Sequence, residues 1–359
     1  MGVALMGGCG PQDLTADNVG VGEVAQEIVG GTAAAITDFP WQASLRNGGS
    51  HFCGGAILGQ WYVLTAQHCV FGRNPANFSL GVGSATRSTM ASSGQVVQVA
   101  DFLLYPGYSG TLDKDVALIR LASPLTLNTT TVKGIPMATA ADVAAGRTNV
   151  GVSATATGWG VLVQGGTPPD DLRKVELPIT TYTDPLDGPL SAYQLAAGGV
   201  AGQSTCQGDS GGPLVVNGAS GKILAGLTSG GVGCGLADHP IIFGRVSAIE
   251  PWVTNIRNRP INNRLTETLS SSTAGEWIHR SFTVAAGTPS LNAQLIGGTG
   301  NGDLYVHSAM PTTSSYTCRP GTSGNAEYCV ITNPAAGTWY VSVRSVSGFA
   351  NVTLRATTY

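Results

Sequence analysis

The sequence predicts an all-β protein with two compact units, and its length, glycine content and low charge support this fold class. A chain of 359 residues exceeds the usual size of one domain, so two hydrophobic cores are expected. The 51 glycines and the charged content of only 11% are typical of many short strands joined by turns, rather than of long helices.

Runs of β-branched and alternating apolar residues recur along the chain and predict its strands. In the first unit they lie at 41–45, 61–65, 96–99, 116–121, 153–157, 214–216 and 223–228, and in the second at 281–284, 303–306 and 338–343. One segment, 249–257, places apolar residues along one helical face and predicts a short helix that Pro260 ends.

Composition divides the chain into four segments. Residues 1–27 lack hydrophobic periodicity, and we expect a signal remnant followed by a removable propeptide. A first domain is expected at 28–259, a linker at 260–263 and a second domain at 264–359. The residues before Cys9 loosely resemble a bacterial lipoprotein cleavage site, which predicts a lipid anchor on the precursor; the alternative is an incidental cysteine in an unstructured tail.

Charge and cysteine content exclude several partners. The net charge of −3 gives no basic surface for nucleic acid, and no apolar run reaches the roughly 20 residues that span a bilayer. None of the seven cysteines forms a Cys-x-x-Cys pair, and we expect no metal and no cofactor. Six of them lie in local pairs along the sequence, which predicts disulfides, an oxidising compartment and a secreted protein. We also expect the protein to be a monomer.

Four features match the needs of a serine-dependent amide hydrolase, which are a hydroxyl, a base, a carboxylate that orients the base, and donors for the oxyanion. Ser210 lies in the glycine-rich turn 208–213, and His68 follows an apolar strand-like run. Asp115 directly precedes another apolar run; Asp113 is its rival, and adjacency to that run favours Asp115. Taken alone, a glycine-rich turn is more often an ordinary surface turn than a catalytic one, and a single histidine is more often an ordinary core residue than a catalytic base.

The chain from Ile28 to about Asn258 resembles the chymotrypsin and trypsin family in a series of motifs that occur in the family's order. The matching segments are 28–31, 39–42, 52–55, 64–69, 115–118, 158–160 and 208–213. This resemblance implies a double six-stranded β-barrel with a short C-terminal helix, and a serine endopeptidase that forms an acyl-enzyme. It also implies that protein or peptide substrates bind here.

The resemblance assigns roles by position. Ser210 is the nucleophile, His68 the general base and Asp115 the group that orients the imidazole, while the N–H groups of Gly208 and Ser210 form the oxyanion hole. The family pattern pairs Cys53 with Cys69 and Cys206 with Cys234.

The same resemblance implies a zymogen. Cleavage between Glu27 and Ile28 frees an amine that inserts beside Asp209. Because a glutamate stands where the trypsin precursor has a basic residue, we expect a separate activating protease rather than self-activation.

The pocket positions favour small aliphatic substrates. Ser204 stands where trypsin has the aspartate that binds Lys or Arg, and Ile241 replaces a wall glycine across from Gly231, with Ser229 beside them. We therefore expect elastase-like cleavage; the alternative is that Ile241 points outward and the pocket is chymotrypsin-like. Gly230 stands where the family usually has tryptophan.

Residues 264–359 resemble the bacterial pre-peptidase C-terminal domain in the segments 302–306 and 337–340 and in the pair Cys318 and Cys329, which implies a β-sandwich and a third disulfide. Its aromatic residues are expected in the core rather than on a binding surface, and Asp303 alone predicts no calcium site. A rival from another class is a non-catalytic, protease-like binding protein.

Overall fold

The structure is a computed structural model that describes residues 28–184, 188–258 and 263–359. The predictions on residues 1–27, which include Cys9 and Glu27, and most of the predicted linker lie outside the described residues. Among the helices of the described ranges, none combines the length and the apolar character that crossing a bilayer requires.

The first barrel closes in the order β2-β3-β4-β7-β6-β5. Its strands are β2 (Gln42–Asn47), β3 (Ser50–Ile57), β4 (Tyr62–Thr65), β5 (Phe78–Val82), β6 (Gln95–Leu104) and β7 (Ala117–Leu121). Alternate strand positions point inward, and side chains such as Leu45, Leu64, Leu80 and Ile119 are fully buried there.

The second barrel contains β8 (Ser153–Gly158), β9 (Arg173–Thr180), β12 (Gln194–Gly198), β13 (Pro213–Asn217), β14 (Lys222–Gly230) and β15 (Pro240–Arg245). Its order is β9-β12-β15-β14-β13-β8, and pairing of β8 with β9 closes it. The short β1 (Thr32–Ala33) adds to β9, and β10 (Thr183–Asp184) pairs with β11 (Gly188–Pro189) outside the barrel.

Helices are few and short in the described chain. They are η1 (Gln67–Cys69), η2 (Pro75–Asn77), α1 (Met90–Ser93), α2 (Ala140–Ala144) and α3 (Val246–Arg257). The predicted helix is α3, which begins three residues earlier than its apolar pattern indicated and buries Ile249, Val253 and Ile256, while Trp252 is only partly buried.

The C-terminal domain is built around one long strand. Its strands are β16 (Asn263–Ser271), β17 (Trp277–Val284), β18 (Ser290–Ile296), β19 (Thr299–His307), β20 (Glu327–Thr332) and β21 (Gly337–Thr358). The first half of β21 pairs with β17 and β19, and its second half pairs with β16 and β18. Both groups of strands contribute to a single apolar core, so the all-β fold class is confirmed.

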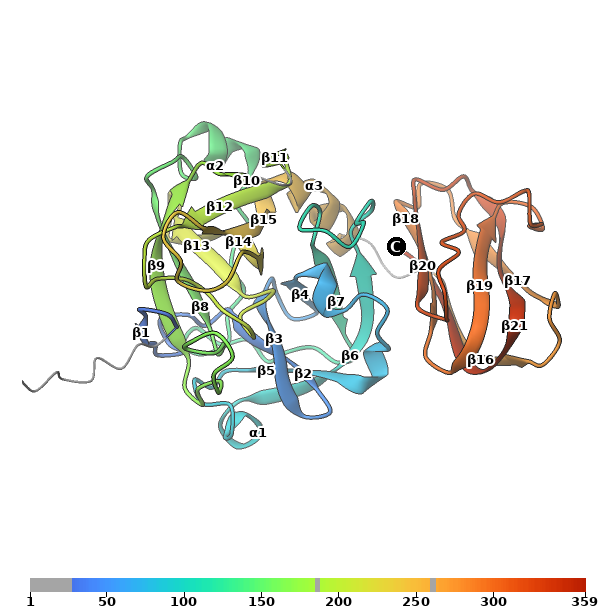
Figure 1. The fold of residues 1–359 in the computed structure, drawn as a ribbon, viewed down its shortest axis with the longest axis horizontal. Helices are drawn as coiled ribbons and strands as arrows, with labels where there is room; N and C mark the ends of the chain where they lie inside the picture. Colours follow the sequence, from blue (N-terminus) through green and yellow to red (C-terminus); the bar gives the residue numbers. More distant parts are fainter. Residues whose placement is uncertain (1–27, 185–187, 259–262) are drawn as a thin grey trace, which may run out of the picture.

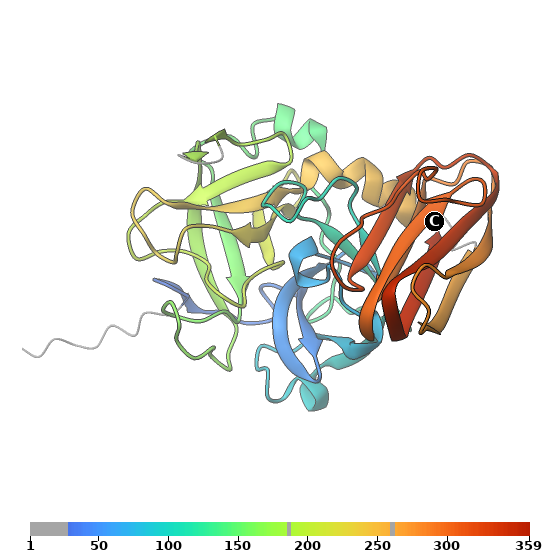
Figure 2. The same ribbon diagram turned by 45° about the vertical axis from the view of Figure 1, so that its right-hand side comes forward.

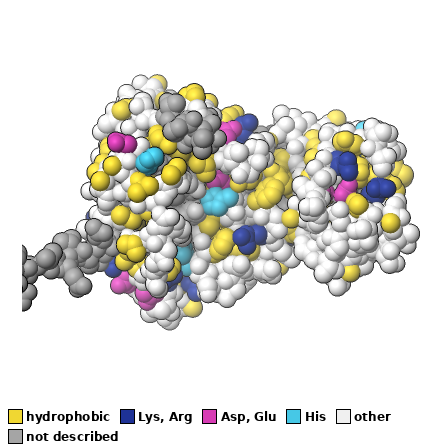
Figure 3. Space-filling view, viewed as in Figure 1, with side chains coloured by type: hydrophobic (Ala, Val, Ile, Leu, Met, Phe, Trp, Pro, Cys, Tyr) yellow, Lys and Arg dark blue, Asp and Glu magenta, His cyan; other side chains and the backbone are white. Residues whose placement is uncertain are grey.

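The two views in Figures 1 and 2 place the C-terminal domain beside the first barrel, on the side where β6 lies. On the face shown in Figure 3, charged side chains are few, in agreement with the charged content of 11%.

Candidate active site

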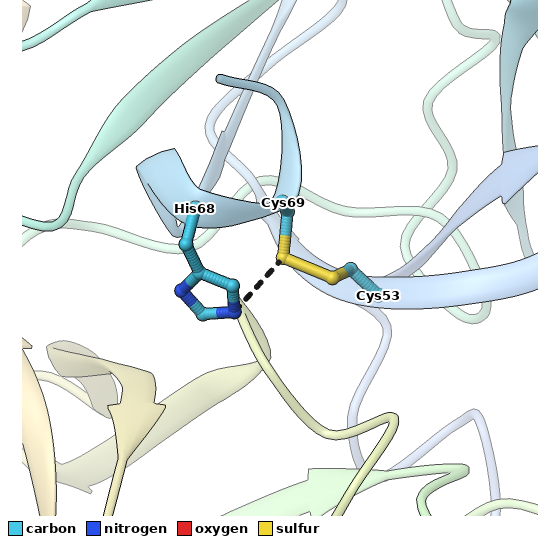
Figure 4. Close-up of side chains that lie close together, drawn as sticks. All are labelled: Cys53, His68 and Cys69. Carbon is cyan, nitrogen blue, oxygen red and sulfur yellow. Dashed lines mark hydrogen bonds between the residues drawn. A yellow bond between two sulfur atoms is a disulfide. The ribbon is translucent and has the colours of Figure 1, made fainter. Parts of the chain in front are cut away.

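His68 lies on η1, the short helical turn that follows β4. The apolar strand ends at Thr65, and a disulfide between Cys53 and Cys69 ties η1 to β3, with a Cα–Cα distance of 6.4 Å. The side chain of His68 is 33% exposed, so its ring is anchored on one edge and accessible on the other. Figure 4 shows the ring beside the disulfide.

Asp115 lies fully buried just before β7 and accepts three hydrogen bonds. The backbone N–H of His68 donates to Oδ1 at 2.8 Å, and Nδ1 of His68 lies 2.7 Å from Oδ2. The hydroxyl of Ser229 also donates to Oδ2, at 2.5 Å. Because a carboxylate can only accept, Nδ1 carries the proton, and Nε2 is left as the basic nitrogen.

The rival Asp113 points elsewhere. It accepts a hydrogen bond from the hydroxyl of Ser191, and its side chain is 36% exposed. Of the two aspartates, Asp115 is therefore the one that contacts His68.

Ser210 lies in a turn that two left-handed glycines shape, Gly208 with φ of +98° and Gly211 with φ of +77°. The N–H of Gly54 on β3 donates to the Ser210 carbonyl at 2.7 Å, which fixes the turn against the first barrel. The Sγ atom of Cys69 lies 3.6 Å from Nε2 of His68 and 3.7 Å from that carbonyl oxygen. In the described chain no hydrogen bond joins the Ser210 hydroxyl to His68, a bond that is often long in structures without substrate.

The N–H groups of Gly208 and Ser210 have no acceptor among the residues that the structure describes. They belong to one turn, in which Gln207 and Ser210 line a cavity. Two unsatisfied donors in one glycine-rich turn are available to an anionic ligand.

Asp209 is completely buried, and its carboxylate is held between two backbone N–H groups, Gly160 at 2.7 Å and Cys206 at 2.9 Å. A Cβ at Gly158 or Gly160 would lie 2.1 or 2.4 Å from its oxygens, so both positions require glycine. Burial raises the pKa of Asp209 to about 6, although the two hydrogen bonds oppose the rise. No ion pair is made to it within the described ranges.

His51 is a residue of this site that the sequence did not indicate. Its Nε2–H donates to the carbonyl of Gly208 at 3.0 Å, so its Nδ1 accepts from Ser44 at 2.8 Å. The ring lies edge-on to Trp159, 5.5 Å away. Burial lowers the pKa of His51 to about 4, and Arg87 and Arg46 add to this, so the ring is neutral. The contact joins residues 157 positions apart, which no local pattern encodes.

A cavity of about 340 Å³ adjoins Ser210. Its lining residues are Gln164, Thr205, Cys206, Gln207, Ser210, Thr228, Ser229, Gly230, Gly231, Gly233, Cys234 and Ile241. The predicted pocket residues Ser229, Gly231 and Ile241 are among them. Ser204 is not; it is buried, and its hydroxyl accepts a hydrogen bond from the N–H of Gly235 at 2.6 Å.

Two aliphatic side chains pack on glycines of this cavity. Ile241 points toward Gly231, because a Cβ built on that glycine would lie 3.0 Å from Cδ1 of Ile241. Leu112 covers Gly230 in the same way, with Cδ2 at 2.9 Å from the position of a Cβ. The small residues at 230 and 231 thus make room for two aliphatic side chains.

Disulfides join Cys206 to Cys234 at the cavity and Cys318 to Cys329 in the C-terminal domain. Cys53, His68 and Cys69 lie close enough together to suggest metal ligands (Figure 4), but both sulfurs are consumed by the disulfide. Without a thiolate, this group does not form a metal site.

The protein is a serine endopeptidase of the chymotrypsin-like fold. This class is defined by the two six-stranded barrels, by the hydrogen bond between a buried aspartate and a partly exposed histidine, and by the serine turn with free N–H groups. The family model described as Trypsin matches residues 28–253, and the model described as the bacterial pre-peptidase C-terminal domain matches residues 281–345. Because the first match covers more than half of the chain, the protein belongs to the trypsin family.

Similar proteins include several named trypsins. Trypsin alpha-4 of Lucilia cuprina is 38% identical over 64% of this chain and 86% of its own length. Trypsin beta of Drosophila erecta is 35% identical over 64% of this chain and 87% of its own. Trypsin-1 of Astacus astacus is 35% identical over 63% and 98%, respectively.

Proposed function

We propose that Ser210, His68 and Asp115 are the catalytic residues of a secreted endopeptidase that forms an acyl-enzyme. The observation that carries this is the 2.7 Å contact between Nδ1 of His68 and Asp115, which leaves Nε2 as a base beside the turn of Ser210. Nε2 takes the proton of the serine hydroxyl as its oxygen attacks the scissile carbonyl, and returns the proton to the leaving amine. Water then repeats the sequence on the acyl-enzyme.

The negative charge that develops on the carbonyl oxygen is bound by the N–H groups of Gly208 and Ser210. Their lack of an internal acceptor in the described chain supports this role. Each such donor contributes about 3 kcal/mol in comparable sites.

Casein hydrolysis by the cleaved chain and by its Ser210→Ala variant tests the proposal. We expect turnover to fall by at least about a thousandfold, because no other group supplies the nucleophile. Ser220→Ala, in the exposed turn after β13, is the matched control and should match the parent. Equal rates for Ser210→Ala and the parent would overturn the catalytic role and favour the non-catalytic binding protein.

The substrate class that we propose is a small aliphatic residue, such as Ala or Val, before the cleaved bond. Ile241 directed toward Gly231 supports a short, apolar pocket, and no acidic side chain lines it. Cleavage-site profiling on a peptide library tests this. Robust cleavage after Lys or Arg would refute it, whereas a preference for Phe or Tyr would establish the chymotrypsin-like alternative.

We propose further that the chain is a zymogen, activated by another protease at the bond between Glu27 and Ile28. The support is Asp209, a buried carboxylate with no cationic partner among the described residues. Ile28 is fully buried in the second barrel core, and the carbonyl of Val29 accepts a hydrogen bond from the N–H of Ser204. A freed amine would supply the missing charge. Activity should appear only on cleavage before Ile28, and full activity of the intact precursor would refute this.

The precursor is proposed to be anchored by a lipid on Cys9 and the mature enzyme to be released. The three disulfides support an oxidising, extracytoplasmic location. Detergent phase partitioning before and after activation tests the anchor. A precursor that remains in the aqueous phase contradicts it.

A further inference from the structure

The C-terminal domain contacts the protease along β6 through both backbone and side chains. Arg355 on β21 donates to the carbonyl of Ala100 at 2.8 Å, and Gln294 on β18 donates to the carbonyl of Phe102 at 3.1 Å. These hydrogen bonds pair two backbone carbonyls of β6 with the C-terminal domain, which Figures 1 and 2 place next to this strand.

Asp101 lies between those two carbonyls and is only 3% exposed. Its Oδ2 accepts hydrogen bonds from Thr357 at 3.0 Å and from the hydroxyl of Tyr359 at 2.9 Å, and Arg355 lies 3.6 Å from Oδ1. Removing such partners from a buried carboxylate is strongly destabilising. The C-terminal domain therefore remains seated on β6 rather than moving freely.

At the other end of this contact, Tyr328 on β20 reaches two segments of the protease. Its ring meets the ring of Phe71 edge-on at 4.4 Å, and its hydroxyl donates to the carbonyl of Tyr108 at 3.1 Å. Phe71 and Tyr108 also contact each other, with ring centroids 5.6 Å apart. Nearby, the side chain of Ala326 packs on Gly72.

These two segments hold His68 and Asp115. The N–H of Phe71 donates to the carbonyl of Gln67, directly before His68, at 2.8 Å. Tyr108 lies on the loop between β6 and β7 that leads to Asp115. One N–H, that of Tyr105, is shared between the side chain of Gln67 at 2.9 Å and the carbonyl of Val116 at 3.1 Å.

We propose that Tyr328 is a positioning residue of the protease: it clamps the turn after His68 to the loop before Asp115, so that the C-terminal domain is part of the catalytic unit. This rests on the catalytic roles proposed above for His68 and Asp115. The second domain thus restricts how far the imidazole and the carboxylate move apart during turnover.

Burial keeps the hydroxyls of Tyr328 and Tyr108 uncharged. The pKa of Tyr328 is raised by burial, although the side chain of Gln67 opposes the rise, and the pKa of Tyr108 is raised to about 12. Tyr328 therefore remains a hydrogen-bond donor at neutral pH.

The test uses the full chain, cleaved before Ile28, with Tyr328→Phe and Tyr328→Ala. Removing the ring and the hydroxyl should lower kcat about tenfold, and removing the hydroxyl alone about threefold, with KM within twofold of the parent. The low-field proton resonance of Nδ1 of His68 should broaden in both variants, because it reports the bond to Asp115 directly. Tyr340→Ala, on the half of β21 that pairs with β17 and β19, is the control and should leave kcat and the resonance unchanged.

Parental kcat and an unchanged resonance in Tyr328→Phe would overturn the proposal, and this variant keeps the packing even if Tyr328→Ala does not fold. An equal loss of kcat in Tyr340→Ala would also overturn it, because the effect would then reflect general loosening of the domain. The Ser210→Ala variant distinguishes failure of this proposal from failure of the proposed catalytic site. If Ser210→Ala retains turnover, the catalytic site itself is wrong, whatever the Tyr328 variants show.

Discussion

Ser229 has two roles in the site: it lines the cavity, and its hydroxyl donates a hydrogen bond to Asp115. The sequence predicted only the first, because the second depends on how β14 packs against the segment before β7. His51 was missed for the same reason. The order of the motifs indicated Ser210, His68 and Asp115, whereas contacts between segments far apart in the chain become visible only in the folded protein.

Ser229→Ala tests the role of that hydroxyl. A hydrogen bond to a charged group contributes about 1.5–3 kcal/mol, and part of this should appear as weaker support of the developing imidazolium. We expect kcat to fall about tenfold with little change in KM for a peptide amide. Ser220→Ala serves again as control, and a parental kcat in Ser229→Ala would show that Asp115 is held sufficiently by His68 alone.

Ile241→Gly tests the depth of the pocket. Removing the side chain that faces Gly231 should open space for a ring, so kcat/KM for a Phe peptide relative to an Ala peptide should rise at least about tenfold. Ile241→Val, a smaller truncation, should give a smaller shift in the same direction. A ratio that does not change in Ile241→Gly would mean that this residue does not set specificity.

At the level of elements, strands with strong residue preferences were predictable and others were not. All seven runs predicted in the first unit overlap strands, which are β2, β4, β6, β7, β8, β13 and β14, and α3 was also predicted. β12 was missed because it has the sequence Gln-Leu-Ala-Ala-Gly, whose alanines and glycine have low strand propensity. It is a strand because β9 and β15 pair with it on both sides.

The contact of β3 with the serine turn gives a prediction at this scale. A Cβ at Gly54 would lie 2.7 Å from Cα of Gly212, and the backbone of the turn would have to shift. Gly54→Ala should therefore lower kcat at least about tenfold by displacing Ser210 and its oxyanion donors.

Gly59→Ala is the matched control, because its Cβ would meet only the flexible end of Arg257, at 3.3 Å. Both variants are measured by kcat and by titration of acylatable serine. Parental values for Gly54→Ala would show that the turn adapts without loss.

For the whole molecule, the arrangement of the two domains could not be predicted from the sequence. Asp101 appears in the sequence only as a charge within a strand-like run, and its partner Thr357 lies 256 positions away. Resemblance to two separate families describes each unit, but not the contact between them.

The stability of the whole chain should depend on pH differently before and after activation. The folded-state pKa of Asp209, about 6, exceeds its ordinary value of 3.8, so the precursor's free energy of unfolding falls as pH rises through this range. The ammonium group that cleavage places beside Asp209 stabilises its carboxylate and lowers its pKa, so the cleaved chain does not lose this stability. The difference in unfolding free energy between the cleaved and uncleaved chains should therefore grow by about 3 kcal/mol from pH 4 to pH 7.

Denaturant unfolding of both forms in the Ser210→Ala background measures this difference. His51 acts in the opposite sense: its lowered pKa of about 4 removes stability as pH falls below 6.5. It does so in both forms, so its contribution cancels in the comparison. A difference that is constant with pH would contradict the pairing of Asp209 with the new amine.

The continuous strand β21 determines how the C-terminal domain comes apart. Since β21 pairs with β17 and β19 along its first half and with β16 and β18 along its second half, neither group of strands can separate without breaking hydrogen bonds to the same backbone. Amide hydrogen exchange in this domain should consequently show one cooperative unit rather than two. Because the end of β21 also lies against β6, unfolding of this strand should break the hydrogen bonds of Thr357 and Tyr359 to Asp101 in the same step.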